Sequence, residues 1–392
     1  MISVSQALSL IEENFPPLQV VEKELIAAVN RVISEDILAS IDMPPFSQSA
    51  MDGYALKWNK SGLYRVIGEQ KAGDSAHIQL GEGEAIRIFT GAQVPQTADT
   101  VVIQEHTERK GEKLRITKSP SKGANIRLKG EQFKRDCVLM KKGTLLHESH
   151  IGLLATLGHQ KVSVYRSPDI AIIITGNELQ IPGTQLAPGK VYESNSFMLR
   201  AALKRHGFEN VSLHTVKDDA TATHKVIQKA LEEHDILLIS GGISVGDYDF
   251  VRESLYANKV TEIFYKINQK PGKPLWFGSK NDKKVFALPG NPASSLICFY
   301  VYVLPFLKKL MGLQNSALGQ KSAQLSTAYK NTRGKTLFLK AMVKNAEAVI
   351  LDGQSSAMLS TFALSNALII IPKEKTIVQK GEPVCYIDLN YE

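Results

Sequence analysis

The residues best suited to chemistry lie in the segment GGISVGDYD, residues 241–249, which follows the apolar run DILLIS. Main-chain N–H groups of a glycine-rich turn can form a nest for an anion, and a nearby hydroxyl adds a further donor. Carboxylates beside such a nest are the oxygen ligands that Mg²⁺ prefers, and Mg²⁺-assisted phosphate chemistry uses this combination. Three glycines and two acids directly after a buried strand favour a binding loop over a structural turn. The residues concerned are Gly241, Gly242, Gly246, Ser244, Asp247 and Asp249.

Two further loops carry acids at comparable positions. TGNEL, residues 175–179, ends the apolar run DIAIIIT and offers Glu178, although a simple turn explains this loop equally well. KDD, residues 217–219, follows the run VSLHTV. We expect Asp219 to cap the next helix. Asp218 is open to the same interpretation, but the acids that accompany it favour a functional role.

Lysines and an open helix end supply the opposite charge. The segment LPGNP, residues 288–292, places Asn291 as a helix cap and Pro292 as the first helical residue, which leaves main-chain N–H groups open to an anion. The segment KINQKPGKP, residues 266–274, surrounds a rigid Pro-Gly turn with Lys266, Lys270 and Lys273. We expect the resulting phosphate or oxyanion pocket to include Pro289, Gly290 and Asn291.

Acids and lysines together indicate chemistry as well as binding. Carboxylates alone would repel a phosphate, and lysines alone would hold an anion without activating it. A metal ion between the acids and a phosphoester offsets the repulsion and polarises the bond. The sequence therefore predicts a metal site formed by Glu178, Asp218 and Asp249.

A parallel sheet is needed to bring these loops together. From residue 169 onward, apolar runs typical of strands buried on both faces alternate with amphipathic helices, which predicts a doubly wound α/β domain over residues 166–312. In such a sheet, ligands bind beyond the carboxyl ends of the strands, where these loops lie. The last helix carries an apolar stripe formed by Ala293, Leu296, Ile297, Tyr300 and Leu304.

The flanking regions have a different texture. Residues 1–165 begin with a helix over 3–15 and continue with short β-type runs, which indicates a helical and extended region with a β unit inserted at about 45–145. Residues 320–392 contain β-type runs and no convincing helix. We expect a separate small β domain there.

The composition narrows the class of protein. The 392 residues carry 47 Lys and Arg against 39 Asp and Glu, a net charge of +8, without a block of consecutive basic residues. A solvated basic surface explains this excess better than nucleic-acid binding. Three widely spaced cysteines argue against disulfides and a thiolate zinc site, and Cys298 is expected in the core. Without a basic leader or an apolar run of the ~20 residues that a membrane helix needs, we expect a cytoplasmic protein.

Long motifs along the chain resemble one family. GGISVGDYD, KPGKP and LPGNP resemble the domain shared by molybdopterin adenylyltransferases and molybdopterin molybdotransferases, the latter including MoeA and the gephyrin E domain. PPFSQSAMDGYAL (44–56), RIFTGAQVPQTADTVVIQE (87–105) and GANIRLKGE (123–131) look like N-terminal signatures of the molybdotransferases. GQSSAMLSTFALSNALIIIP (353–372) resembles their small C-terminal domain.

The resemblance implies a multidomain fold with an extended N-terminal region and an inserted β domain, a central molybdopterin-binding α/β domain, and a C-terminal β barrel. Members are homodimers, with the site between the central domain of one subunit and the β domains of the other. The implied reaction inserts molybdate into the dithiolene of adenylylated molybdopterin, cleaves the phosphoanhydride and releases AMP, with a divalent cation such as Mg²⁺. A molybdopterin adenylyltransferase is a candidate partner.

Matched by motif position, the resemblance assigns residue roles. The implied catalytic residues are Asp52, Thr90, Glu178, Asp218, Asp249, Lys266 and Lys270. The implied substrate-binding residues are Gly241, Gly242, Ser244, Lys273, Pro289, Gly290, Asn291 and Ser356. Asp52 can also be interpreted as a turn residue before Gly53.

Two positions depart from the family pattern. Gln132 follows GANIRLKGE where the family usually has aspartate, and a neutral amide cannot replace an anionic ligand or base. Asn177 replaces a common aspartate but keeps a hydrogen-bonding oxygen.

Two other functions remain open. Adenylyl transfer to molybdopterin uses the same central domain, but the additional N- and C-terminal domains argue against it. A non-enzymatic scaffold, as in gephyrin's receptor clustering, is favoured only by Gln132.

Overall fold

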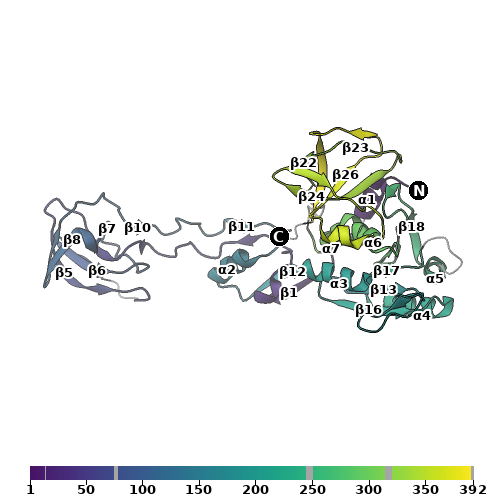
Figure 1. Cartoon of the computed structure of the whole chain (residues 1–392). Coiled ribbons are helices and arrows are strands. Elements are labelled where there is room, and N and C mark those ends of the chain that lie inside the picture. Colours follow the sequence, from purple (N-terminus) through teal and green to yellow (C-terminus); the bar gives the residue numbers. More distant parts are fainter. Residues whose placement is uncertain (14, 75–77, 244–249, 314–319, 390–392) are drawn as a thin grey trace. The chain divides into compact units, whose positions relative to one another are not determined.

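The computed structural model describes residues 1–13, 15–74, 78–243, 250–313 and 320–389, which group into two compact units (Figure 1). The first unit comprises Met1–Ser34, Gly143–Ile151 and Lys161–Glu392, and the second comprises Glu35–Lys142 and Gly152–Gln160. The second unit contains most of the β-rich insertion that the sequence places at about 45–145.

The second unit is built on a six-stranded sheet. The strand order is β7-β4-β6-β5-β9-β8, and only β5 and β6 pair in parallel. Glycine at position 53 lets β4 approach β7, because a Cβ there would lie 2.0 Å from the carbonyl oxygen of Val102. The bounds are β4 (Gly53–Leu56), β5 (Leu63–Gln70), β6 (Glu84–Ile88), β7 (Thr100–Ile103), β8 (Thr107–Lys110) and β9 (Lys113–Ile116).

Short elements complete the N-terminal region. In the second unit, β2 (Ile37–Leu38) pairs with β11 (Val138–Met140), β3 (Gln48–Ser49) pairs with β10 (Ile126–Arg127), and η2 spans Gln104–His106. In the first unit, β1 (Val20–Glu24) pairs with β12 (Lys161–Tyr165), and η1 spans Ile26–Ala28. Helix α1 (Val4–Glu12) is shorter than the predicted 3–15 and starts at a Ser3 capping box, and α2 covers Glu148–Thr156.

The first unit contains the predicted α/β domain. Its six-stranded sheet has the order β16-β13-β17-β21-β20-β18. The first four strands are parallel, whereas β20 and β18 run antiparallel at one side, a detail beyond the predicted parallel arrangement. The bounds are β13 (Ile170–Thr175), β16 (Val211–Val216), β17 (Ile236–Ser240), β18 (Thr261–Tyr265), β20 (Trp276–Lys280) and β21 (Lys283–Leu288).

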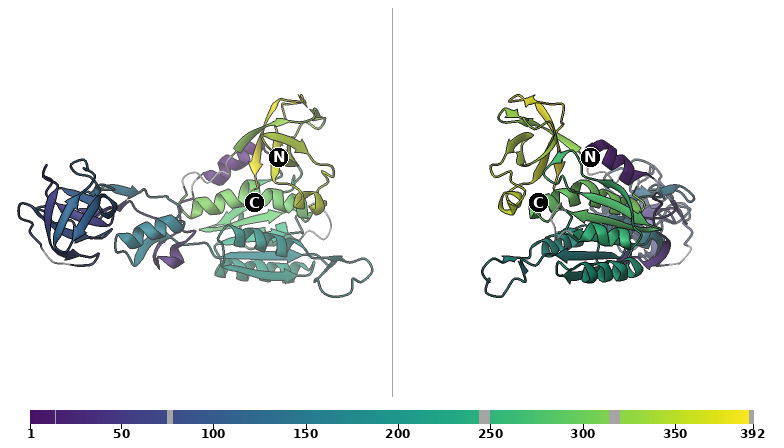
Figure 2. Two further views of the ribbon diagram at one scale, coloured as in Figure 1. Left: turned by 60° about the vertical axis from the view of Figure 1, so that its left-hand side comes forward. Right: turned by 90° about the vertical axis from the view of Figure 1, so that its right-hand side faces the viewer.

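Helices cover both faces of this sheet (Figure 2). Alternate residues of β13 divide between two cores: Ile172 packs in the same core as Leu203 of α3, and Ile173 packs in the same core as Ile227 of α4. Strands buried on both faces therefore explain the continuous apolar runs. The helices are α3 (Asn195–Arg205), α4 (Ala220–Glu233), α5 (Val251–Ala257), α6 (Pro292–Cys298), the π-helical segment η3 (Phe299–Val303) and α7 (Leu304–Leu310).

The last three helical segments run on as one long helix. Pro292–Leu310 is long and apolar enough to cross a membrane by length and composition alone, but most of it is buried in the molecule. The core helices of globular proteins can have the same length and composition, and the whole predicted stripe from Ala293 to Leu304 lies in the core.

The C-terminal domain is a closed five-stranded barrel. The order β24-β25-β22-β28-β26 closes because β24 also pairs with β26. Strand β19 (Gln269–Lys270) from the α/β domain adds to β24 in parallel. The bounds are β22 (Gln320–Leu325), β24 (Thr336–Lys344), β25 (Glu347–Ile350), β26 (Ala367–Ile371) and β28 (Pro383–Asp388), with the pair β23 (Tyr329–Lys330) and β27 (Ile377–Val378) and the short helix α8 (Leu359–Ala363) alongside.

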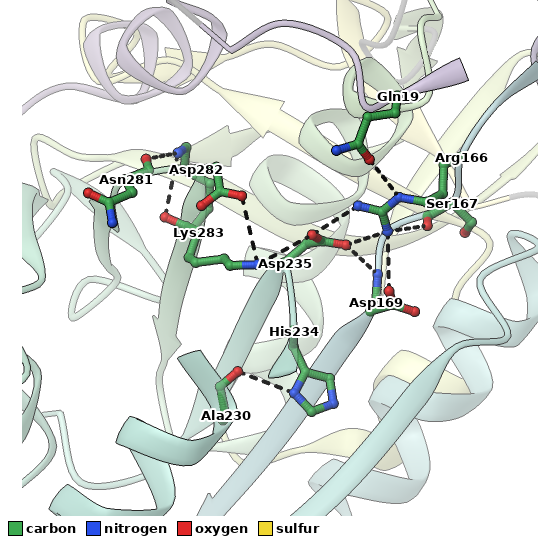
Figure 3. A network of polar contacts seen from close by, with 11 residues as sticks. Gln19, Arg166, Ser167, Asp169, Ala230, His234, Asp235, Asn281, Asp282 and Lys283 are labelled. Atoms are coloured by element: carbon green, nitrogen blue, oxygen red, sulfur yellow. Dashed lines mark hydrogen bonds and ion pairs between the residues drawn. The ribbon is translucent and has the colours of Figure 1, made fainter. Parts of the chain in front are cut away.

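An ion-pair network links residues at the amino-terminal end of the central sheet (Figure 3). Asp235, which precedes β17, accepts from both terminal nitrogens of Arg166 at 2.7 and 3.0 Å. It also accepts from the main-chain N–H of Asp169 at 2.8 Å and lies 3.7 Å from Lys283 at the start of β21. The network thus fixes three strand starts at the end of the sheet opposite to the predicted site.

Candidate functional site

A cavity of about 500 Å³, here named the acidic cavity, opens at the carboxyl ends of the parallel strands. Four loops meet in it: those after β13, β16, β17 and β21. This is the location expected for a ligand in a doubly wound sheet. Among the predicted site residues, it is lined by Glu178, Asp218, Gly241, Gly242, Pro289, Gly290 and Asn291.

Glycines 241 and 242 are required by a close approach to Thr175 at the end of β13. Both have positive φ, +98° and +59°, which L side chains rarely adopt. A Cβ on Gly241 would lie 2.5 Å from the carbonyl oxygen of Thr175, and one on Gly242 would lie 2.9 Å from its hydroxyl. The Thr175 hydroxyl is itself buried and has no hydrogen-bond partner within the described residues. The start of the glycine loop therefore presents main-chain atoms to the cavity.

The two acids of the cavity belong to neighbouring loops. Asp218 accepts a hydrogen bond from the main-chain N–H of Asn177 at 3.0 Å, and Asn177 accepts one from the main-chain N–H of Asp218 at 3.2 Å. This reciprocal pair of hydrogen bonds fixes the Asp218 carboxylate. One of the two bonds uses the side-chain oxygen of Asn177, which stands where aspartate is common in the family. The Glu178 carboxylate lies against Gly176. A Cβ on Gly176 would be 2.9 Å from both carboxylate oxygens of Glu178. Asp219 caps α4 as predicted, accepting from the N–H of Ala222.

Helix α3 adds residues that the sequence analysis did not select. Asn195, 9% exposed, donates to the Ser240 hydroxyl at 2.8 Å and to the Gly290 carbonyl at 2.7 Å, so it joins the loops after β17 and β21. Ser194 occupies the N-cap position of this helix but makes no side-chain capping hydrogen bond. Instead, the buried Glu193 accepts from the N–H and hydroxyl of Ser196. Both Glu193 and Asn195 line the acidic cavity.

A second cavity, about 440 Å³ and here named the basic cavity, lies between the Pro-Gly turn and the C-terminal barrel. Burial, together with the positive charges of Arg333 and Lys335, holds the pKa of Lys270 below its ordinary value. Clustered cations of this kind attract an oxyanion. The polar residues that line the cavity include Lys270, Lys330, Arg333, Ser355 and Ser356.

The two cavities share a wall. Asn291, at the N-cap position of α6, does not cap the helix with its side chain but donates to the Ser356 hydroxyl at 3.0 Å. Pro274 lines the acidic cavity, and Pro271, at the other end of the same turn, lines the basic one. The sequence predicts one pocket for the acids and the lysines, whereas the structure has two cavities that are adjacent but distinct.

A buried lysine supports the loop that carries Ser356. Lys340, 1% exposed, donates to the carbonyls of Gly353, Ser355 and Met358 at 2.8, 3.2 and 3.0 Å. The carbonyl and N–H of one planar trans peptide point in opposite directions. The N–H of Ser356 consequently points away from Lys340. Sequence reasoning missed both Lys340 and Arg333, because neither belongs to a motif.

The other predicted lysines lie elsewhere. Lys266 has φ of +65° and places its ammonium 4.6 Å from the centre of the Tyr265 ring. Lys273 is exposed, and neither Lys266 nor Lys273 lines either cavity. The structure therefore brings Lys270 alone of the three to Ser356. Ser244, Asp247 and Asp249 lie outside the described residues.

The predicted residues of the second unit form a pair. Asp52 accepts from the N–H and the hydroxyl of Thr90, each at 2.8 Å. The main-chain and hydroxyl hydrogen bonds from Thr90 lower the pKa of Asp52. Gln132 is exposed, and its N–H donates to the carbonyl of Met43.

The acidic cavity can accommodate a hard cation with substrate oxygens completing its shell. Among the described residues, no group of three His, Cys, Asp or Glu is placed to hold a metal. Glu178 and Asp218 nevertheless contribute two carboxylates, and the buried Thr175 hydroxyl has no partner in the part of the chain that the structure describes. Mg²⁺ characteristically uses one or two carboxylates together with substrate phosphates and water. The residues present fit such an ion.

Comparisons with known proteins agree with this architecture. Residues 2–158 match the MoeA N-terminal region (domain I and II), residues 171–309 match the probable molybdopterin binding domain, and residues 322–389 match the MoeA C-terminal region (domain IV). The molybdopterin molybdenumtransferase of Staphylococcus aureus strain Mu50 is 33% identical over 383 residues, covering 95% of this chain and 91% of that protein. This chain belongs to the MoeA family.

Two further MoeA-family comparisons extend over the full chain. The molybdopterin molybdenumtransferase of Haemophilus influenzae is 32% identical over 413 residues, covering 100% of this chain and 99% of that one. The crystal structure of a MoeA protein from Pyrococcus horikoshii superposes with a TM-score of 0.85 at 30% identity, with complete coverage of both chains. The predicted fold class is thereby confirmed. Both curated relatives are named molybdopterin molybdenumtransferase, and this MoeA-family chain is accordingly a transferase of molybdenum cofactor biosynthesis.

Proposed function

We propose that this enzyme inserts molybdate into the dithiolene of adenylylated molybdopterin, cleaves the phosphoanhydride and releases AMP. The observation that carries the proposal is the pair of adjacent cavities with opposite charge. A phosphoanhydride bound through a metal ion suits carboxylates and main-chain donors, whereas molybdate suits cationic side chains, so two cavities of opposite charge match the two reactants. The Asn291–Ser356 hydrogen bond lies where the two cavities meet.

In this proposal, the acidic cavity binds the phosphoanhydride. The start of the glycine loop at Gly241 and Gly242 and the loop of Pro289, Gly290 and Asn291 surround the phosphates, with Ser244 contributing a hydroxyl. Glu178 and Asp218, with Asp249, would hold a divalent cation such as Mg²⁺. A cation bound there supplies polarisation of the phosphate oxygens. The roles proposed for Ser244 and Asp249 rest on the motif resemblance alone.

Molybdate is proposed to bind in the basic cavity. Lys270 and Arg333 supply positive charge, and Ser356 supplies a hydroxyl and an N–H turned away from Lys340. Lys266 and Lys273 would add to the positive potential from outside the cavity.

Further parts of the proposal rest on the family resemblance. We propose that the enzyme is a cytoplasmic homodimer, that the Asp52–Thr90 pair takes part in the reaction, and that a molybdopterin adenylyltransferase supplies the pterin. Sedimentation of the purified chain tests the dimer. A monomer at concentrations that support full activity would contradict it.

The activity is tested by mixing the purified protein with adenylylated molybdopterin and Mg²⁺, then adding molybdate and measuring AMP. We expect AMP to appear only after molybdate is added, and Asp218→Asn to slow its release about a hundredfold or more, as for loss of a group that organises charge at the reacting bond. Accumulation of adenylylated pterin from ATP and molybdopterin would instead identify an adenylyltransferase. If neither reaction occurs, the scaffold function gains support, and Gln132→Asp tests whether that departure is its cause.

A further inference from the structure

A buried amide lies directly behind the turn that carries Lys270. Gln269 has no exposed surface, and its side-chain nitrogen donates to the carbonyls of Pro271 at 3.0 Å and Gly272 at 3.3 Å. Gly272 has φ of +86°, and a Cβ there would lie 2.7 Å from both this nitrogen and the Cys298 sulfur. The turn is therefore packed closely against the Gln269 amide, and its two carbonyls face inward.

A tyrosine of the long helix holds the other end of this amide. The Tyr302 hydroxyl donates to the side-chain oxygen of Gln269. Tyr302 is fully buried, and burial raises its pKa well above the ordinary range, so the hydroxyl keeps its proton. Because the oxygen accepts from Tyr302 and the nitrogen donates to two carbonyls, the orientation of the Gln269 amide is determined by its partners.

The local helix geometry contributes to this contact. Tyr302 lies in the π-helical segment Phe299–Val303, between α6 and α7. A π turn shifts the register of the residues that follow it and occurs often at functional sites. The start of the same helix, at Asn291 and Pro292, lines the acidic cavity. One rigid element thus supports both the phosphate side of the site and the lysine turn.

A turn that had only to reverse the chain would not need a polar chain of this kind. Burying an amide and a phenol in an apolar core costs free energy unless every polar atom is paired, and each pairing restricts geometry. Here the pairing fixes Pro271 and Gly272, which directly follow Lys270, and Lys270 lines the basic cavity.

We infer that Tyr302 and Gln269 are positioning residues that hold the Lys270 turn in place for molybdate. The inference rests on the proposed role of the basic cavity. Neither residue lines either cavity, so both act through Lys270 and the turn.

The test uses the full chain and measures binding of molybdate by equilibrium dialysis and of AMP by calorimetry. In Tyr302→Phe, the Gln269 oxygen loses its donor, and we expect the Kd for molybdate to rise roughly tenfold or more, as for a small misplacement of a binding group. The Kd for AMP should stay within twofold. Tyr165→Phe, which removes another buried phenol of the same unit, should change neither constant.

A second variant changes the donating end of the same amide, and retained AMP binding serves as the folding control for each variant. Gln269→Glu keeps the shape but replaces the donating amide with an acceptor that opposes the two turn carbonyls. We expect it to weaken molybdate binding as well, and the double variant with Tyr302→Phe to be less than additive, since both changes act on one chain of contacts. Unchanged molybdate binding in both single variants overturns the inference, as does an equal loss of molybdate and AMP binding. If the wild-type chain itself does not bind molybdate, the proposed role of the basic cavity falls, and this inference falls with it.

Discussion

Thr175 restricts which residues fit at positions 241 and 242, at the start of the glycine loop. Its carbonyl and hydroxyl lie so close to positions 241 and 242 that no side chain fits at either. Gly290 lies beside Gly241 with ordinary spacing, since a Cβ on Gly290 would be 3.7 Å from the Gly241 Cα. Two glycines of one site therefore differ in what they tolerate.

We predict that Gly241→Ala lowers the stability of the first unit by about 2 kcal/mol or more, because it combines a left-handed backbone conformation with a steric overlap. Gly290→Ala should change the stability by less than about 0.5 kcal/mol. Thermal unfolding of both variants measures the difference. Equal stability of the two would show that the loop relaxes freely and that Thr175 does not constrain it.

A second prediction compares Lys270 with Lys273. Lys270→Met should raise the KM for molybdate about 10- to 100-fold, because a hydrogen bond to a charged group contributes about 1.5–3 kcal/mol. Lys273→Met should have a smaller effect, since that side chain is exposed and lines neither cavity. Steady-state AMP release at varied molybdate checks this order, and a larger effect at Lys273 would contradict the assignment of the basic cavity.

Single residues were predictable from the sequence where the local rule was strong. Asp219 caps α4, and Cys298 is a core residue, because helix starts and apolar runs are local patterns. Asn291 occupies the expected cap position, but its side chain bonds to Ser356, which is distant in the sequence. Lys340 could not be found in this way, since a lysine in a strand predicts exposure and only the folded loop supplies its three carbonyls.

At the scale of elements, strand β24 and the loop after β25 act together. The ammonium of Lys340 in β24 donates to carbonyls of the loop. In return, the Gln354 side chain accepts from the N–H of Lys340 at 3.0 Å and donates to its carbonyl at 2.8 Å. The strand therefore supports the shape of the loop that faces the basic cavity.

We predict that Lys340→Met reduces stability by about 2 kcal/mol or more, since three carbonyls lose a charged donor, and that it raises the KM for molybdate. Lys344→Met, at the exposed end of the same strand, is the matched control and should be neutral. Unfolding and AMP-release assays on both variants test this. Wild-type behaviour of Lys340→Met would show that the loop keeps its shape without the cation.

The network at the other end of the central sheet yields a prediction about pH. Burial raises the pKa of Asp235, but the hydrogen bonds from Arg166 and from the N–H of Asp169 outweigh it and leave the pKa below its ordinary value of 3.8. A lowered carboxyl pKa contributes stability above the unfolded-state pKa, and this contribution is lost as pH falls through the folded-state pKa. We predict that Asp235→Asn destabilises the first unit by about 2–3 kcal/mol at pH 7.

The difference from the wild type should shrink as pH falls below about 4. Asp282→Asn is the matched control, since that carboxylate is 77% exposed and 3.8 Å from Lys283, and it should have little effect at any pH. Unfolding by denaturant at several pH values measures both variants. A constant difference down to pH 2 would contradict the assigned ionisation.

The observed helices and strands agree with the prediction where the hydrophobic periodicity of the sequence is clear. Strands β13 and β17 are continuous apolar runs, as expected for strands buried on both faces, and α4 begins directly after its predicted cap Asp219. Strand β20 was not predicted, because Trp276–Lys280 contains glycine, serine and lysine, and its antiparallel pairing with β18 and β21 depends on the tertiary arrangement. The π segment inside the long helix also has no local sequence signal.

For the whole molecule, the order of the domains could be predicted, because the texture changes at each boundary and the family motifs follow in sequence. The separation of the site into two cavities could not. It requires the C-terminal barrel to approach the Pro-Gly turn through β19 and β24, a contact between residues far apart in the chain. The sequence predicted one pocket for acids and lysines, whereas the structure has an acidic and a basic cavity with a common wall.

The acidic cavity is proposed to bind the phosphoanhydride and the basic cavity to bind molybdate. A crystal soaked with tungstate, as a heavy analogue of molybdate, together with AMP and Mg²⁺, and measured for anomalous scattering, tests this division. We predict a tungsten peak in the basic cavity, next to Lys270 and Ser356, and AMP density in the acidic cavity, next to the loops of Gly241 and Gly290. Tungsten in the acidic cavity with the basic cavity empty would contradict the proposed binding sites.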